Sequence, residues 1–583
     1  MKTSIFEPTL FKKNVKRFMP LWLAYFFIWI LILSGVIIKA ATTEPRVTDS
    51  MMSLTELIRQ ISQGGSGFIS FVFMMLSAYF VFSFMYSENS VTFINSLPLK
   101  RENVFLSSVA SGIIPIIIAN IFIFLLMLLL SLSLELKISG FLLRWFEIAS
   151  LISLGYYGLA VLCCNVSGNA PASIILYLIF NFLAAVIYIS FNGVAEIFLF
   201  GYEAVELSET AIIKFSPPAA LVIELLFGIE SGGVFAETYS IHFALVGLAF
   251  IFISFFLFKN RSMETAGEFI SQRGLRPAFK VCMGLVSALV LGIILYYIFF
   301  GNLKGDKSFI PFMLCSLVSA AIGYFVGEAL IEKKLDVFKN KKSNLMFLCV
   351  SIITVAFVMI LRFDVFGYEK NVPDSDEIQS FSIGVRGVEL NNCENKEIIN
   401  EAVALHRIFT ESKADSIEKD DLRSFFIDIS YKLKDGSKLS RSYRFFCDPS
   451  GSRDDLPEAL KAAERFINTK PVVLERLKIE FENIRERDSY AAMDFDFPML
   501  EETKEQPELY SKDFSLKLFR DFYENAVMKD AANGNIGHRS IVADEKAMEN
   551  FYNCSVSFYY EKDEKTGRYN WRLEFIDTNP PQA

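Results

Sequence analysis

A glycine- and lysine-containing stretch at residues 301–308 is the first place in this sequence where the residue types suggest chemistry. It reads Gly-Asn-Leu-Lys-Gly-Asp-Lys-Ser, which contains the components of a phosphate-binding loop. The spacing departs from the Gly-x-x-x-x-Gly-Lys-Ser/Thr pattern, and no strand–loop–helix unit surrounds the stretch. We therefore interpret it as a polar turn, so that any nucleotide chemistry must come from another chain.

Two other groups of side chains suggest catalysis, namely the carboxylates of Asp494 and Asp496 and the histidines His406 and His538. Paired carboxylates carry out glycoside hydrolysis, but the alternating Asp-Phe-Asp-Phe pattern is more typical of an edge strand or an acidic loop. The two histidines have no companions at metal-ligand spacing. Gly-x-Ser-x-Gly and His-Glu-x-x-His motifs are also missing. We expect a non-catalytic chain with no metal site and no cofactor of its own.

The composition divides the chain into two parts. The 583 residues are 52% hydrophobic and yet 21% charged, with a mean hydropathy of +0.37. Residues 1–361 carry a net charge of +4 and residues 362–583 a net charge of −12. An apolar, slightly basic part is therefore joined to a polar, acidic part, and the acidity argues against nucleic acid as a partner.

The apolar part contains nine runs long enough to cross a bilayer. The longest, 104–134, is interpreted as one long helix, because it is too short for two full spans. The spans carry few charges, whereas ion-coupled transporters hold several, and Glu328 falls just past the eighth run. The nine runs are 19–38, 67–86, 104–134, 148–164, 172–191, 241–258, 281–300, 309–326 and 345–361.

Lysine and arginine clusters set the orientation of these spans in the cell membrane. With the N-terminus in the cytoplasm, the cytoplasmic segments hold 17 Lys and Arg residues and the short outside loops hold 8. This distribution agrees with the positive-inside rule. An odd number of spans then leaves residues 362–583 on the extracytoplasmic side, and the lysine-rich stretch 333–342 before the last span supports that placement.

The acidic part has the pattern of an α+β domain. Residues 425–433 and 438–446 alternate around Lys-Asp-Gly-Ser and predict a β-hairpin. The three cysteines of this part, Cys393, Cys447 and Cys554, fit no zinc pattern. The sequence allows one disulfide among these three cysteines, although we favour the interpretation without one. A second hairpin is predicted at 555–560 and 569–575, and helices at 456–467, 472–484 and 514–528.

The segment before the first span, residues 1–18, predicts an amphipathic helix at the membrane interface. Apolar residues recur at i, i+4 and i+7, and basic residues flank them, which is the pattern of an interfacial helix. The residues of this predicted membrane-interface helix are Phe11, Lys12, Lys13, Val15, Lys16, Arg17 and Phe18.

Three further segments stand out between the spans. The cytoplasmic loop 88–103 contains Asn-Ser-Leu-Pro-Leu-Lys-Arg-Glu-Asn, an apolar and then charged element between spans two and three. The outside segment 192–240 holds two moderately apolar pieces, 194–202 and 211–228, each too short or too charged to span. A cytoplasmic stretch at 261–267 follows the sixth span.

In this order, the features resemble ABC-2-type exporter permeases of Gram-positive bacteria, in particular those with a C-terminal extracytoplasmic domain. The resemblance covers residues 1–258 and implies a six-span core at 19–258 that begins with the interfacial helix. It further implies a coupling element at 88–103 and short re-entrant helices within 192–240. Residues 259–361 add three spans, and for the domain at 362–583 the resemblance is only general.

The resemblance implies a permease subunit of an ATP-driven exporter, energised by a separate ABC ATPase subunit that binds the ATP. A second permease subunit, identical or homologous, completes the pathway in the lipid bilayer for an amphipathic drug, lipid or peptide antibiotic. The alternative is a membrane receptor or signalling protein whose external domain binds a ligand without transport. For the loop 88–103 itself, the alternative to a coupling element is a plain cytoplasmic turn. The residues expected to couple to the ATPase are Asn95, Leu97, Pro98, Leu99, Lys100, Arg101 and Glu102.

Overall fold

The chain forms two compact units. We call residues Met1–Val194, Val205–Gly301 and Ile310–Phe357 the helical unit, and residues Ala195–Ala204, Asn302–Phe309 and Val358–Ala583 the sheet unit. The computed structural model describes residues 6–42, 65–136, 138–203, 216, 218, 237–301, 305–334, 341–385, 388–413, 423–447, 456–476, 478, 492–498, 511–513, 551–562 and 569–576.

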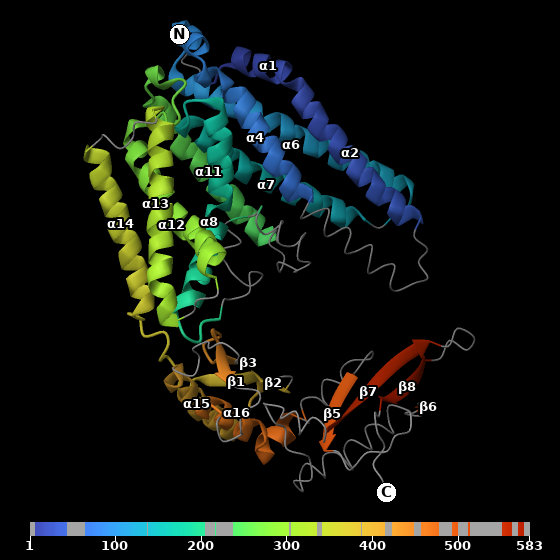
Figure 1. The fold of residues 1–583 in the computed structure, drawn as a ribbon. Coiled ribbons are helices and arrows are strands. Elements are labelled where there is room, and N and C mark those ends of the chain that lie inside the picture. The colour runs from blue at the N-terminus through green and yellow to red at the C-terminus, as the bar shows by residue number, and fades with distance from the viewer. Residues whose placement is uncertain are drawn as a thin grey trace. The chain divides into compact units, whose positions relative to one another are not determined.

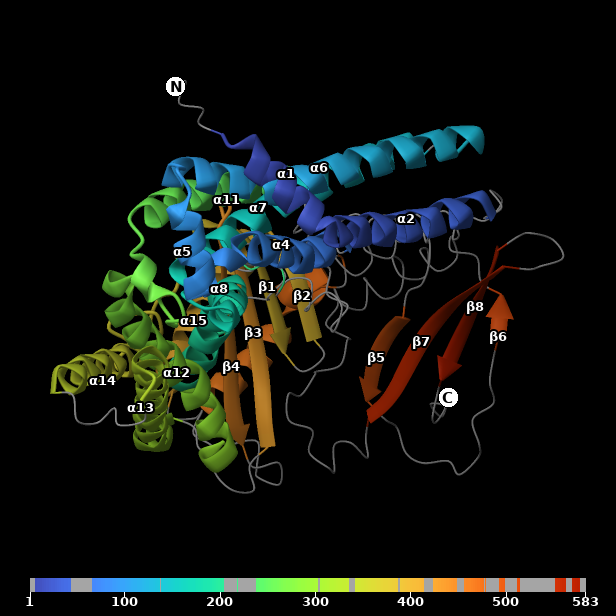
Figure 2. The same ribbon diagram turned by 90° about the horizontal axis from the view of Figure 1, so that it is seen from above.

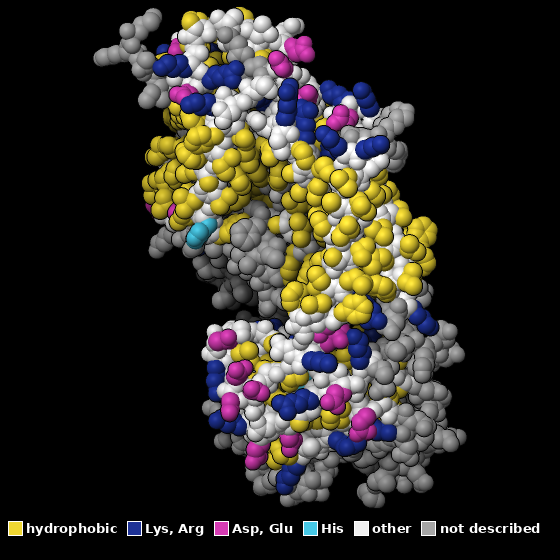
Figure 3. Space-filling model, turned by 90° about the vertical axis from the view of Figure 1, so that its left-hand side faces the viewer, with side chains coloured by type: hydrophobic (Ala, Val, Ile, Leu, Met, Phe, Trp, Pro, Cys, Tyr) yellow, Lys and Arg dark blue, Asp and Glu magenta, His cyan; other side chains and the backbone are white. Residues whose placement is uncertain are grey.

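Among the described residues, nine helices are long and apolar enough to cross a membrane, as the sequence predicts. On the face shown in Figure 3, hydrophobic side chains form a wide band over the helices, and Lys and Arg side chains lie at its upper end. The helices, coloured blue to yellow in Figure 1, are α2 (Met19–Thr42), α4 (Ser66–Phe82), α6 (Arg101–Ser133), α7 (Ser139–Val166), α8 (Ala170–Phe198), α11 (Glu237–Lys259), α12 (Arg276–Phe300), α13 (Phe309–Glu332) and α14 (Lys341–Arg362).

Helix α7 lies at the centre of the helical unit, where it packs against α4, α6 and α11. It comes closest to α11 at glycines, because a Cβ atom at Gly158 would collide with the carbonyl oxygen of Gly247. Small residues that let two backbones touch are a common basis of helix packing in membranes. Helix α6 is a single helix of 33 residues that includes Pro115, which confirms the prediction of one long span rather than two.

The sheet unit contains a four-stranded antiparallel sheet with the order β2-β1-β3-β4. The predicted hairpin is present as β3 and β4, with residues 434–437 as its turn, and the predicted helix at 456–467 is α16. Helices α15 and α16 share one hydrophobic core with the strands and lie side by side (Figure 1). The elements are β1 (Ile378–Val385), β2 (Val388–Cys393), α15 (Lys396–Glu411), β3 (Arg423–Leu433), β4 (Lys438–Cys447) and α16 (Glu458–Ile467).

A second antiparallel sheet has the order β5-β7-β8-β6 (Figure 2). Its strands β7 and β8 are the second predicted hairpin. Strand β5 contains Asp494 and Asp496 and lies at the edge of the sheet, so the prediction of an edge strand is confirmed. Cys393 and Cys447 are buried thiols of the first core. The strands are β5 (Ala492–Pro498), β6 (Ser511–Asp513), β7 (Phe551–Lys562) and β8 (Tyr569–Ile576).

The segment after α8 differs from the prediction of a re-entrant piece at 194–202. Helix α8 continues to Phe198, and the residues that follow pack within the sheet unit. The Phe200 ring lies 5.1 Å from that of Tyr443 and joins the core of the first sheet. Gly201, with φ +71°, lies against the Tyr443 ring, where a Cβ atom would collide. The second predicted piece, 211–228, is outside the described residues apart from positions 216 and 218, as are the helix predicted at 514–528 and most of the one at 472–484.

Candidate functional site

The predicted coupling segment 88–103 forms a short helix, α5 (Glu88–Ser96), followed by an extended stretch and the start of α6. Helix α5 ends before Leu97 because a residue that precedes proline avoids the helical conformation; Leu97 has φ −75° and ψ 142°. Val91 is buried under the helix, whereas the Phe93 ring on its outer side is 57% exposed. Helix α5 is therefore amphipathic and presents an aromatic ring to its surroundings.

The extended stretch after α5 alternates between buried and exposed side chains. Leu97 and Leu99 are half-buried, and Leu99 packs against the core of the helical unit. Pro98 and Lys100 are exposed beside them. The side chain of Asn95 is outside the described part of the chain. The exposed side chains of segment 88–103 thus include Phe93, Pro98 and Lys100, together with Glu88 and several small polar residues of α5.

Arg101 and Glu102, at the start of α6, bind the end of α11. The Arg101 guanidinium donates to the carbonyl oxygens of Lys259 at 3.3 Å and of Arg261 at 3.0 Å. The Glu102 carboxylate forms an ion pair with Lys259 Nζ at 2.8 Å. Two of the residues expected to contact a partner are therefore engaged within the chain, where they connect α6 to α11.

Arg261 is a buried arginine that the sequence analysis did not single out. It is 3% exposed, and its Nη1 donates to the carbonyl oxygens of Cys164 at 3.4 Å and Asn165 at 3.2 Å. The same nitrogen lies 3.7 Å from the Met85 sulfur. Burial lowers the pKa of this guanidinium, yet an arginine stays charged at any pH near neutrality. The carbonyl end of α7 attracts the cation because the helix dipole is negative there.

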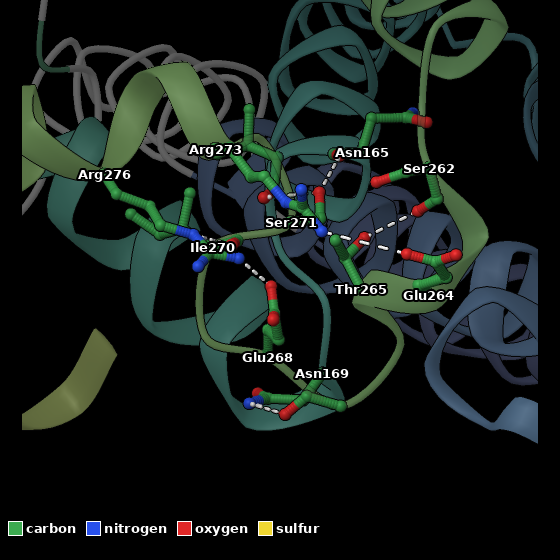
Figure 4. A network of polar contacts seen from close by, with 12 residues as sticks. Asn165, Asn169, Ser262, Glu264, Thr265, Glu268, Ile270, Ser271, Arg273 and Arg276 are labelled. Carbon is green, nitrogen blue, oxygen red and sulfur yellow. Dashed lines mark hydrogen bonds and ion pairs between the residues drawn. The ribbon is translucent and has the colours of Figure 1, made fainter. Parts of the chain in front are cut away.

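The segment after Arg261 closes around the junction between α7 and α8 (Figure 4). Ser271 Oγ donates to a carbonyl oxygen at the end of α7, that of Val166, at 2.9 Å, and the Ser271 N–H donates to the same oxygen at 2.8 Å. The Gly267 N–H donates to the Gly168 carbonyl at 2.7 Å. A Cβ atom at Gly168 would collide with carbonyl oxygens of this segment. Arg276 forms an ion pair with Glu268, so the segment is held at both ends.

Residues 8–17, within the segment predicted as a membrane-interface helix, form the helix α1 (Pro8–Arg17), with Phe18 at its C-terminal cap. It packs along α6: the Glu7 N–H donates to Ser107 Oγ at 2.8 Å, and Asn14 Nδ2 donates to Ser111 Oγ at 3.2 Å. Its apolar and basic residues take opposite sides, as predicted. Val15 and Phe18 pack against the core and Phe11 is half-buried, whereas the exposed side chains are Lys12, Lys13, Lys16 and Arg17.

A second buried charged cluster lies among α12, α13 and α14. The Lys280 ammonium group forms an ion pair with the Glu328 carboxylate at 2.6 Å, and both side chains are largely buried. Ser343 Oγ donates to the same carboxylate at 2.7 Å. The prediction that Glu328 follows the eighth span is wrong, because α13 continues to Glu332. Three helices are thus joined by one carboxylate.

His406 is a core histidine of the sheet unit, as the absence of ligand-spaced companions indicates. Its Nδ1 is 3.1 Å from the Tyr431 hydroxyl and its Nε2 is 2.7 Å from the Tyr443 hydroxyl. Burial, with the nearby Arg441 cation, lowers the pKa of His406 to about 4. His538 is outside the described residues.

Within the described part of the chain, no three His, Cys, Asp or Glu side chains are grouped so that they could hold a metal ion. The feature that stands out is a set of charged side chains that connect the ends of helices. Arg101, Glu102 and Arg261 connect the start of α6 to the ends of α11 and α7. No family model, no curated protein and no solved structure matches this chain.

Proposed function

We propose that this chain is the membrane-spanning subunit of an ATP-driven exporter of the ABC-2 type, energised by an ATPase on a separate chain. One observation carries the proposal: a short amphipathic helix between the second and third candidate spans presents Phe93 outward and is followed by a segment connected to two other spans. Such a helix offers a partner protein a small apolar contact at Phe93, and the exposed Lys100 follows it in the chain.

In the proposed mechanism, ATP-driven closure of two ATPase subunits displaces α5. The displacement reaches α6 directly, because α6 begins at Arg101. It reaches α11 through the ion pair of Glu102 with Lys259, and α7 through the hydrogen bonds of Arg261 with the carbonyl end of that helix. Two permease subunits then alternate between inward and outward access. The hydrogen bonds of the buried Arg261 to main-chain carbonyls suit the transmission of motion to α7, because salt screens buried charges much less than exposed ones.

The proposed orientation places α5 and the segment after Arg261 in the cytoplasm and the sheet unit outside the cell. The cargo is an amphipathic drug, lipid or peptide antibiotic. Cysteine accessibility tests the orientation: a cysteine at the exposed position Ser437 reacts with an impermeant reagent in intact cells, and one at the exposed position Glu264 does not. Ser271 is unsuitable for this test because it is buried. The opposite labelling pattern would invert the orientation.

The proposed function is tested by removing the exposed contact of α5 without touching the internal connections. A Phe93→Asp/Lys100→Glu variant is expected to lose the co-purifying ATPase and ATP-dependent export, while the melting temperature stays near that of the parent. The matched control is Lys334→Glu, an exposed lysine at the end of α13. Full retention of the ATPase by the Phe93→Asp/Lys100→Glu variant would show that α5 is not the docking element.

A further inference from the structure

The turn that follows α14 carries the most exposed large hydrophobic side chains in the described part of the sheet unit. Phe363 and Val365 are each 65% exposed and Phe366 is 84% exposed. Three such side chains within four residues are unfavourable on a surface that meets water, since the transfer of apolar surface out of water is favourable. We therefore expect a lipid or protein surface to bury the apolar side chains of this turn.

The turn is built by specific hydrogen bonds and is not a loose connection. The Val365 N–H donates to the Ile360 carbonyl at 3.2 Å, which closes the end of α14. The Asp364 carboxylate accepts the N–H groups of Tyr368 at 2.7 Å and Glu369 at 2.9 Å. Asp364 and Gly367 adopt positive φ angles, 43° and 68°. The apolar side chains are thus displayed on a fixed backbone.

The same turn is fastened to the first sheet. The buried Arg441 donates to the carbonyl oxygens of Tyr368 at 2.9 Å and Asn371 at 3.3 Å, and its guanidinium lies 3.6 Å from the centre of the Tyr368 ring. The Glu369 carboxylate accepts from Lys413 Nζ at 2.6 Å and from the Phe200 N–H at 2.9 Å. Anything that holds the turn therefore also holds the sheet and the segment after α8.

The length of α14 indicates what covers the turn. Arg362 lies twenty positions after Lys342, which corresponds to a helical rise of about 30 Å. This rise equals the thickness of the hydrocarbon core of a bilayer. The turn lies just beyond Arg362, where apolar side chains of interfacial elements enter the boundary between headgroups and acyl chains. Helix α14 carries exposed apolar side chains up to its last turn, Ile352 and Ile360 among them, and the turn follows directly in the chain. Lipid that covers α14 therefore extends to the turn.

We propose that Phe363, Val365 and Phe366 insert into the interfacial region of the lipid bilayer and hold the first sheet of the sheet unit at the membrane surface. The sheet is then a fixed element beside the bilayer and not a ligand-binding module on a free tether. The proposal requires that α14 crosses a membrane, but it does not depend on transport or on an ATPase.

Fluorescence quenching by brominated lipids tests this proposal in the intact chain. Phe366→Trp, reconstituted into phosphatidylcholine vesicles, is expected to lose most of its added emission when the acyl chains are brominated near the headgroup, and less when they are brominated near their ends. Phe426→Trp is the matched control, because Phe426 is 55% exposed on strand β3, next to Arg444. Its added emission is expected to stay unquenched.

Two results would overturn the proposal. The first is a Phe366→Trp signal as insensitive to brominated lipid as that of Phe426→Trp. The second is a blue-shifted emission without bromine quenching, which would mean that a second copy of the chain or another protein covers the turn. Phe363→Trp repeats the measurement at a second position of the turn if Phe366→Trp does not fold, and the same two outcomes apply to it.

Discussion

Both units bury an arginine cation, Arg261 in the helical unit and Arg441 in the sheet unit, but among the described residues only the sheet unit buries a histidine, His406, as a neutral ring. Arg261 binds the carbonyl end of α7, and Lys280 pairs with Glu328 among three helices. His406 instead lies between two tyrosine hydroxyls, with a pKa of about 4. The contribution of the Arg261 and Lys280 cations to stability therefore depends on their partners being present. The contribution of His406 depends on pH.

Removal of the lysine from the Lys280–Glu328 pair should have the largest effect. Lys280→Met leaves the Glu328 carboxylate buried without its counter-ion, which costs about 3–5 kcal/mol of stability. Thermal unfolding in detergent measures this as a large drop in the melting temperature. Lys280→Met/Glu328→Met should recover most of the loss, since a hydrophobic pair of similar volume often replaces a buried ion pair without cost. A double variant as unstable as Lys280→Met would show that the pair itself stabilises the three helices.

Acidification should affect the sheet unit next. The His406 pKa is about 4 in the folded chain and about 6.5 when unfolded, so the unfolded state binds more protons between these values. Stability is therefore full above pH 6.5 and falls by about 3 kcal/mol as the pH drops to 4. The buried thiols Cys393 and Cys447 report the loss when they react with a pyridyl disulfide reagent that works in acid.

The matched control for this pH dependence is His406→Gln, which cannot gain a proton. Its free energy of unfolding is expected to be lower than that of the parent at pH 7 but nearly constant down to pH 4. If the thiols of His406→Gln became accessible over the same pH range as in the parent, other groups would be responsible for the acid sensitivity.

The Arg261 cation should contribute less than the Lys280 pair, because its removal leaves carbonyl oxygens and not a charge. Arg261→Met loses charge-assisted hydrogen bonds and should lower stability by about 2 kcal/mol. The expected change is seen as faster amide exchange at the end of α7. Arg273→Met is the control, because Arg273 is exposed and its ion pair with Glu264 is long, at 3.8 Å. Equal changes in amide exchange in the two variants would mean that the buried hydrogen bonds of Arg261 add nothing to stability.

The exposed Glu102–Lys259 pair should have the smallest effect on stability. Glu102→Gln is expected to leave the melting temperature unchanged, because exposed ion pairs contribute little. If the pair transmits motion from α6 to α11, the same variant should uncouple ATP hydrolysis from export and still bind the ATPase. Normal coupling in Glu102→Gln would limit transmission to the hydrogen bonds of Arg101.

Patterns local in sequence predicted much of this fold. Hydropathy located the nine apolar helices, and strict alternation located the hairpins β3–β4 and β7–β8 and the edge strand β5. Strands β1 and β2 and helix α15 escaped notice. Helix α15 nevertheless carries a clear start signal, because Asn395 caps it by accepting the Glu397 N–H.

The connections of the site were not predictable in the same way. Arg261 resembles any positive residue that follows a span, and nothing local distinguishes a buried arginine from an exposed one. Its partners at the end of α7 lie almost one hundred residues earlier in the chain. Glu328 was placed just past the eighth span because a charge ends an apolar run, but its partner Lys280 lets α13 keep it buried. Such pairs depend on which helices become neighbours.

Photo-crosslinking in the cell identifies what α5 contacts. A photo-crosslinking amino acid in place of Phe93 is irradiated in intact cells, with the same substitution at Phe426 as the control. We expect position 93 to form a covalent adduct with an ATP-binding protein and position 426 to form none. Adducts at position 93 with lipid alone, or with proteins that bind no ATP, would contradict the assignment of this chain as a transporter subunit.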